Sequence, residues 1–177
     1  DCFIQPPAIR HRVLEASDGI EVVEIGVPAE HVTEVDHAMT LPTPVLRRDR
    51  EWQGQRFVHD VAARAAWAPF RLGGWEARDT GIAEATRGVA GVQVARPAGG
   101  DPAPWAVHDA DILFGFVIRG GVTLEGEGKA PYALSEGDAF VVPPGLATRL
   151  AAPSGDCELL EVALPGRFAT RDVAAPG

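Results

Sequence analysis

The chain has 177 residues, of which 46% are hydrophobic and 23% charged, and its formal net charge is −9. This composition excludes wholesale disorder, and the acidic balance argues against nucleic-acid binding because no basic stripe is present to neutralise phosphates. Two cysteines, Cys2 and Cys157, are too few for a disulfide framework or a thiolate metal site, and no apolar run approaches the length of a membrane span.

The first 33 residues are predicted to form three strands separated by turns. The strands are CFIQ, IRHRVLEA and IEVVEIGV, and the turns are PPA and SDG. Side chains alternate across a strand, so Ile9, His11 and Val13 are expected on one face. His11 would therefore share a face with apolar residues.

This opening segment is a second copy of a later one. Without gaps, residues 1–28 lie on residues 138–165, so that EVVEIGVP faces ELLEVALP. The identical pairs are Asp1 and Asp138, Phe3 and Phe140, Pro6-Pro7 and Pro143-Pro144, Arg12 and Arg149, Ser17 and Ser154, Glu21 and Glu158, Glu24 and Glu161, and Pro28 and Pro165. An internal repeat decides how a fold is divided. Because the first copy begins inside its unit, with no Met before Asp1, we expect the chain to be a fragment.

The rest of the chain divides into three parts. Residues 34–72 are polar and proline-containing and are predicted to be a linker with a lead-in strand. Within them, FVHDVAARAAW suits either a helical turn or a strand. Residues 73–168 carry many short valine-rich strands punctuated by turns such as GG, SEGD and PSGD, and residues 169–177 form a tail. Short strands at close spacing, without helices between them, predict an all-β sandwich, jelly roll or barrel.

Two motifs in the complete unit resemble those of the cupin superfamily, a small jelly-roll barrel. The first motif is marked by Gly100, His108 and Gly120, and the second by Gly137, Asp138, Pro143 and Gly145. Together with the partial first copy, the resemblance extends to a bicupin. It implies that residues 1–33 are the C-terminal part of a first barrel, which adds strands to the complete barrel of residues 73–168.

In this family the motifs supply metal ligands, namely three histidines and a carboxylate that converge inside the barrel. The resemblance places Ala106, His108, Leu113 and Thr148 at these four positions, so one ligand of four is kept. We therefore expect no cofactor in the complete barrel. His108 is expected to be a hydrogen-bonded barrel histidine, with a residual metal role as the less favoured reading.

The first copy differs at one position that matters. His11 stands where Thr148 stands in the second copy, although Ala8 and Glu15 depart from the family motif. If the missing first-barrel ligands are supplied, the resemblance makes His11 a ligand for a divalent transition metal in an intact first barrel.

A pocket without metal is the other use of such a barrel. We expect its walls to include Ala106, Leu113, Thr148 and Arg149, and Trp105 either closes a barrel end or joins them. The complete barrel is thus predicted to be non-catalytic and to serve in packing, dimerisation or small-molecule binding. The alternative is a fragment of a metal-dependent bicupin enzyme, similar to a dioxygenase, with its active site in the first barrel.

The expected partners are a small-molecule ligand and a second copy of the chain, because unpaired strand edges invite pairing. A homodimer is therefore predicted. Neither a nucleic acid nor a membrane is an expected partner, and a cytoplasmic location is the default expectation.

Overall fold

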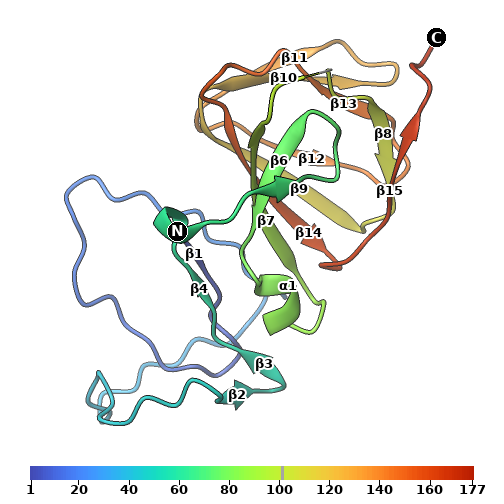
Figure 1. Ribbon diagram of the computed structural model, residues 1–177. Helices are drawn as coiled ribbons and strands as arrows, with labels where there is room; N and C mark the ends of the chain where they lie inside the picture. The colour runs from blue at the N-terminus through green and yellow to red at the C-terminus, as the bar shows by residue number, and fades with distance from the viewer. Residues whose placement is uncertain (101) are drawn as a thin grey trace.

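The computed structural model describes residues 1–100 and 102–177, and its centre is a barrel of two antiparallel sheets that face each other (Figure 1). The larger sheet has six strands, in the order β12 (Ala139–Val142), β9 (Ile112–Arg119), β14 (Glu158–Leu164), β7 (Gly91–Pro97), β6 (Trp75–Asp79) and β5 (Ala68–Pro69). The smaller sheet has five, in the order β11 (Tyr132–Ser135), β10 (Gly121–Gly126), β13 (Thr148–Ala151), β8 (Trp105–His108) and β15 (Thr170–Val173). The predicted all-β, jelly-roll fold class is confirmed.

The hydrophobic core lies between the two sheets. Val117, Leu159 and Ala95 contribute to it from the larger sheet, and Val122 and Leu150 from the smaller one. Leu159 is 1% exposed and Val117 is fully buried. Each strand sends alternate side chains inward, so the apolar alternation of the sequence becomes a filled interior.

The barrel extends beyond residues 73–168 at both ends. Strand β5 lies in the segment predicted as a linker with a lead-in strand and pairs with β6, and β15 lies in the predicted tail and pairs with β8 along its whole length. The turn after β6 contains a short helix, α1 (Ile82–Ala85), although no helix was expected between the strands.

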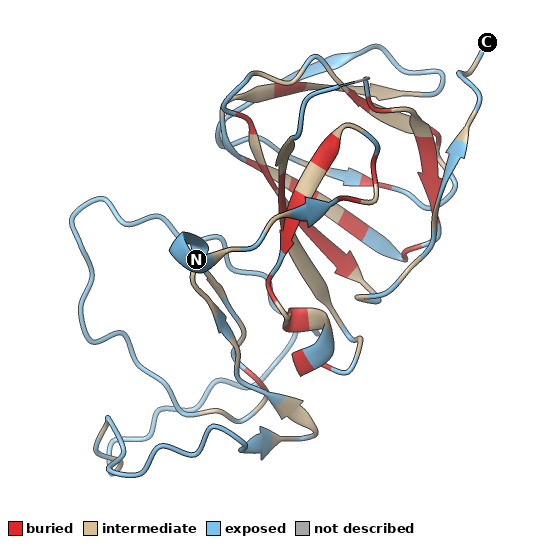
Figure 2. Ribbon diagram, viewed as in Figure 1, coloured by how far each residue is buried: buried red, intermediate tan, exposed pale blue. Residues whose placement is uncertain are grey.

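The N-terminal segment has less structure than the sequence predicted. Of the strands expected in residues 1–33, all of which are described, only β1 (Cys2–Phe3) is present, and the expected strands over 9–16 and 20–27 are wrong. Figure 2 shows this segment as an exposed loop beside the barrel, and Val13 and Val22 are 81% and 67% exposed. A strand is held by hydrogen bonds to neighbouring strands, and in the part of the chain that the structure describes no strand pairs with these residues.

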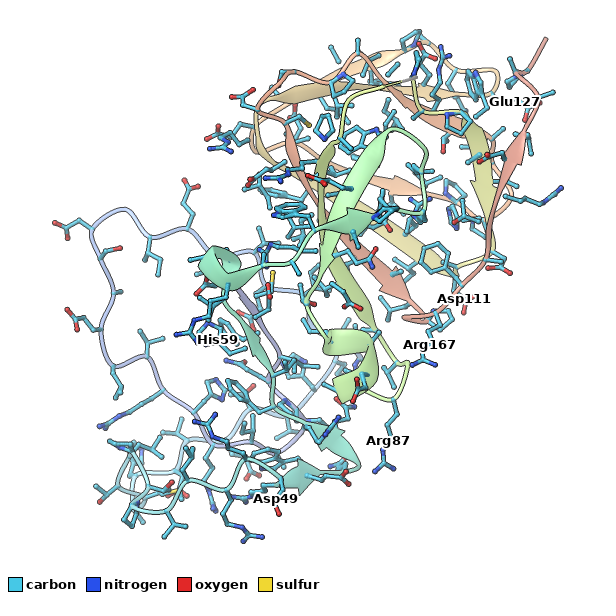
Figure 3. All side chains as sticks on the ribbon, viewed as in Figure 1. Asp49, His59, Arg87, Asp111, Glu127 and Arg167 are labelled. Carbon is cyan, nitrogen blue, oxygen red and sulfur yellow. The ribbon has the colours of Figure 1, made fainter. Side chains whose placement is uncertain are left out.

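The remaining short elements join the N-terminal segment to the barrel. Strand β1 pairs with β4 (His59–Asp60), and β2 (Glu51–Trp52) pairs with β3 (Gln55–Arg56). The stretch that suited either a helix or a strand contains both, because β4 is followed by a 3-10 helix at Ala62–Arg64. Figure 3 shows His59 on β4, where its Nε2 atom lies 3.1 Å from the Asp1 carboxylate. No helix in the described part of the chain is both long and apolar enough to cross a membrane.

Candidate functional site

The site is centred on His108, at the end of β8. Ala106 belongs to the barrel core, and His108, two residues further along the strand, faces the same interior. Its side chain packs edge-on against Phe168 with the ring centroids 6.0 Å apart, and the residue is 5% exposed. Both ring nitrogens are buried and have no hydrogen-bond partner among residues 1–100 and 102–177. A buried polar group without a partner is uncommon and marks a place where a water or ligand fits.

Burial lowers the pKa of His108, and the neighbouring Arg71 guanidinium lowers it further. The Val142 carbonyl and the carboxylates of Glu161 and Asp109 oppose this shift, although the carbonyl lies outside hydrogen-bonding geometry. His108 is therefore neutral in the folded protein at neutral pH, with one ring nitrogen as a donor and the other as an acceptor.

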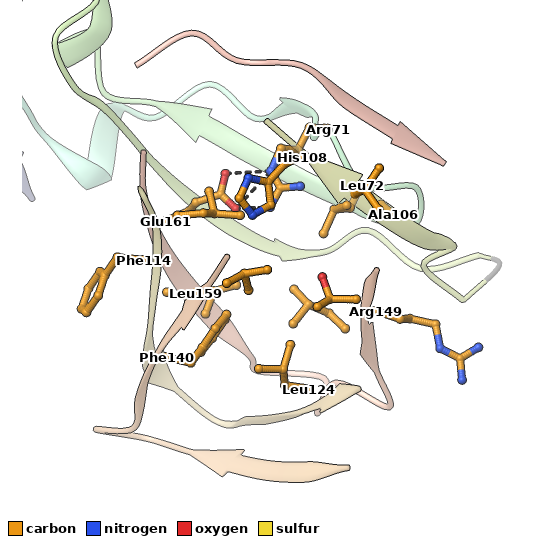
Figure 4. Close-up of a pocket in the computed structure, with 16 residues that line it drawn as sticks. Arg71, Leu72, Ala106, His108, Phe114, Leu124, Phe140, Arg149, Leu159 and Glu161 are labelled. Atoms are coloured by element: carbon orange, nitrogen blue, oxygen red, sulfur yellow. Dashed lines mark hydrogen bonds and ion pairs between the residues drawn. The ribbon is translucent and has the colours of Figure 1, made fainter. Parts of the chain in front are cut away.

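An ion pair between Arg71 and Glu161 lies beside the histidine (Figure 4). Nε of Arg71 donates to Oε1 of Glu161 at 2.8 Å, and Nη2 donates to Oε2. The Arg71 guanidinium also lies over the Phe70 and Phe168 rings, at 5.2 and 5.5 Å from their centroids. The side chains are 20% and 8% exposed, so most of the pair is withdrawn from water. The two charges compensate each other and leave the interior formally neutral.

A small cavity opens between these polar groups and the apolar core. Its walls include His108, Ala106, Leu113 and Thr148, together with the Arg71–Glu161 pair. The free space of about 20 Å³ is enough for roughly one water molecule. His108 also borders a wider hollow outside β8 and β15. There the His108 carbonyl accepts a hydrogen bond from Gly145 N, so the backbone of His108 forms part of the wall of this hollow.

The comparisons with known proteins bear on this barrel. Residues 93–163 match the family described as the cupin domain. The barrel is a cupin domain. A search of curated proteins found no significant match.

Solved structures resemble the cupin fold of this chain at low sequence identity. The polyketide cyclase RemF from Streptomyces resistomycificus is 16% identical with a TM-score of 0.53, over 66% of this chain and 85% of that one. The nucleoside dehydratase Pac13 from Streptomyces is 14% identical with a TM-score of 0.52, over 67% and 92%. A mutant of Bacillus subtilis oxalate decarboxylase is 19% identical with a TM-score of 0.51, over 63% of this chain and 31% of that one. At these identities the likeness shows the fold alone.

The structure brings together four positions that the cupin resemblance singled out. Ala106, His108, Leu113 and Thr148 all line the one cavity, although they come from three strands. Thr148 and Ala106 are direct partners across β13 and β8.

Other residues singled out from the sequence lie elsewhere. Arg149 borders the cavity, but Figure 4 shows its side chain directed away from it, and its Nε donates to Glu125 at 2.8 Å. The Arg149 guanidinium lies 5.4 Å from the centroid of Trp105, so these two residues pack together on the outer side. His11 is exposed, in the N-terminal segment.

Sequence reasoning missed Arg71 and Glu161 as parts of the site. Arg71 lies in the predicted linker, where no sequence pattern indicated a side chain directed into the barrel. Glu161 did leave a signal, because it is a charged residue in the apolar run of β14 and is repeated as Glu24 in the first copy.

The residues around His108 do not fit the metal that the cupin family implies. One imidazole and one hydroxyl stand where three imidazoles and a carboxylate are needed, and the nearby Glu161 carboxylate is bound by Arg71. Within the described residues, no group of three His, Cys, Asp or Glu side chains could hold a metal ion.

Proposed function

We propose that this cupin barrel is a non-catalytic binding module for a small neutral molecule that carries a hydroxyl group. The observation behind the proposal is the His108 ring, whose two buried nitrogens have no hydrogen-bond partner in the described chain. A hydroxyl group can donate to one ring nitrogen or accept from the other, whichever tautomer is present. The neutral His108 ring and the compensated Arg71–Glu161 pair favour an uncharged ligand over an ion.

A ligand larger than water requires the cavity to widen. Leu124 and Phe140 belong to its walls and are only partly buried, so a change of side-chain rotamer can make room. Ala106 and Leu113 leave the remaining surface apolar, which suits the carbon skeleton of such a ligand.

The test is an NMR titration of protein labelled with 15N-histidine against ethylene glycol, 1,2-propanediol and phenol. We expect saturable shifts of the His108 ring nitrogens with at least one compound, and loss of binding in His108→Leu. The matched control is His59→Leu. His59 is about half exposed, lies on β4 and is far in sequence from His108. Equal binding by His108→Leu, or no saturable shift, would refute the proposal. Stoichiometric iron, manganese, nickel or zinc that is lost on His108→Ala would also refute it.

A second candidate function is a metal-dependent bicupin enzyme whose site lies in the first barrel. It is favoured by the alignment of His11 with Thr148, because Thr148 lines the cavity of the complete barrel. Metal analysis of the purified chain separates the two candidates. Metal lost on His11→Ala but kept in His108→Ala would support the first-barrel site.

A further inference from the structure

The ring of Phe168, in the loop between β14 and β15, contacts two polar residues of the candidate site. It meets the His108 ring edge-on, with the centroids 6.0 Å apart and the planes at 80°. The central carbon of the Arg71 guanidinium lies 5.5 Å from the Phe168 centroid, within the range of a cation–π contact. Phe168 therefore places an aromatic ring against the imidazole and the guanidinium at once.

The same ring closes one end of the cavity. It packs against the buried cluster of Leu113, Val142 and Ala163, and the first two of these residues are also cavity walls. The cluster is 3–4% exposed, whereas Phe168 itself is only partly buried. The Phe168 ring thus separates this end of the cavity from solvent, and a movement of the ring alone opens the cavity to the outside.

The backbone is fixed on both sides of Phe168. Before it, Gly166 packs so closely against the neighbouring chain that a Cβ atom would lie 2.6 Å from Gly91 N. After it, Ala169 N donates to Asp109 Oδ1 at 2.7 Å, and Asp109 N donates to Ala169 O at 3.2 Å. The Phe168 side chain can therefore change its rotamer while the backbone keeps its place.

A ligand larger than water needs the space of this ring. The free volume beside His108 is about 20 Å³, which holds roughly one water molecule. We call the space that the Phe168 ring occupies between His108, Arg71 and the apolar cluster the aromatic slot. A ligand ring in this slot keeps the contact with the guanidinium and covers the same apolar residues, so the slot suits an aromatic ring.

A hydroxyl group on such a ring adds the hydrogen bond that phenylalanine cannot make. Phe168 has no polar side-chain atom, and both buried nitrogens of His108 lack a hydrogen-bond partner in the described residues. A phenolic hydroxyl can donate to an imidazole nitrogen or accept from one. An aliphatic alcohol can make this bond too, but it loses the cation–π contact with Arg71. The two residues together therefore favour a hydroxylated aromatic ligand.

We propose that Phe168 holds the place of the aromatic ring of the ligand, and that the ligand is an uncharged phenol that displaces it. This inference rests on the function proposed above and names the ligand class of that site. Binding then requires Phe168 to leave the aromatic slot, so the wild-type protein binds phenol more weakly than a protein whose slot is empty.

The test compares phenol with cyclohexanol, which has the same carbon count and a hydroxyl group but no aromatic ring. Both affinities are measured by NMR titration of the wild type and of Phe168→Ala. We expect Phe168→Ala to bind phenol at least about tenfold more tightly than the wild type, because no closed state competes. It should prefer phenol over cyclohexanol by at least about fivefold, because only phenol makes the cation–π contact.

The matched control is Phe140→Ala. Phe140 is another partly buried wall of the cavity, so its removal enlarges the cavity and leaves the aromatic slot filled. Its preference for phenol over cyclohexanol should not exceed that of the wild type. The proposal would be overturned by a preference in Phe140→Ala as large as in Phe168→Ala, by equal affinity of Phe168→Ala for both alcohols, or by no gain in its affinity for phenol.

A second measurement leaves the aromatic slot intact. Wild-type protein labelled with para-fluorophenylalanine gives a 19F resonance for Phe168, which Phe168→Leu assigns. On saturation with phenol we expect this resonance to move to the shift of a solvent-exposed ring, and an unchanged resonance would overturn the proposal.

The two proposals can fail separately. If ethylene glycol shifts the His108 nitrogens while phenol leaves Phe168 in place, this inference fails and the proposed function stands. If phenol displaces Phe168 equally well in His108→Leu, the proposed function fails and the aromatic slot stands.

Discussion

At the scale of single residues, His108 makes the stability of the barrel depend on pH. Its pKa is lowered from 6.5 by burial and by Arg71, so the unfolded chain binds a proton that the folded chain does not. The free energy of unfolding therefore keeps its full value above pH 6.5 and decreases as the pH falls towards the folded-state pKa of His108.

We predict that the free energy of unfolding decreases below pH 6.5 by up to about 1.4 kcal/mol per pH unit more than in His108→Leu. Urea denaturation from about pH 5 to about pH 8, the range in which histidine changes its charge, measures the difference. The same substitution at exposed His37 should leave the wild-type profile in place. Parallel profiles for the wild type and His108→Leu would contradict the prediction.

The Arg71–Glu161 pair makes a second prediction at this scale. Removing one partner leaves a charge in a mostly buried position, so Arg71→Met should destabilise the fold by about 3 kcal/mol. The double variant Arg71→Met/Glu161→Leu should recover most of this loss, because no unpaired charge remains. Guanidinium denaturation of both variants provides the measurement, and additive losses would show that the pair is not coupled.

At the scale of elements, the β9–β10 hairpin depends on one glycine. Gly120 has φ of +70°, and a Cβ atom there would lie less than 3.0 Å from Ser154, Asp156 and Cys157. Gly128, in the β10–β11 turn, has a similar φ of +66° with nothing within 4 Å. Substitutions at the two positions therefore distinguish the cost of backbone strain from the cost of steric overlap.

We predict that Gly128→Ala costs about 1 kcal/mol from backbone strain alone. Gly120→Ala should cost about 1–3 kcal/mol more, because the loop carrying Ser154 must also move. Thermal or urea denaturation of the two variants measures this difference. Equal losses would mean that the Ser154 loop adapts freely.

Several elements could be predicted from the sequence and others could not. Alternating apolar runs between turn residues located β9, β12 and β14, since both faces of these strands have fixed environments. Residues 20–27 have an equally clear pattern, yet they form no strand. The pattern reports which face can be buried, whereas a strand also requires a neighbour that local sequence does not specify.

At the scale of the whole molecule, the N-terminal segment exposes an unusual amount of apolar surface for a folded protein. Val13, Val22 and Ile25 are 81%, 67% and 42% exposed, within one run of residues. Exposed apolar runs with strand-like alternation promote association between chains.

We therefore predict that the chain sediments as a dimer or a larger species at concentrations on the order of tens of micromolar. The double variant Val22→Asp/Ile25→Asp should shift it towards the monomer. A matched control, Ser17→Asp/Thr33→Asp, adds the same charge without removing apolar surface and should associate more than that variant. A monodisperse wild-type monomer in analytical ultracentrifugation would count against the prediction.

The sequence by itself determined the all-β class and the repeat of residues 138–165 in residues 1–28, and the resemblance to the cupin motifs singled out Ala106, His108, Leu113 and Thr148. These features follow from local alternation, turn residues and motif spacing, which a linear chain displays directly. Only the tertiary structure placed Arg71 of the predicted linker against Glu161 and brought both beside His108. Such contacts join residues 90 positions apart, and their partners are chosen by sheet order and burial, which no local pattern encodes.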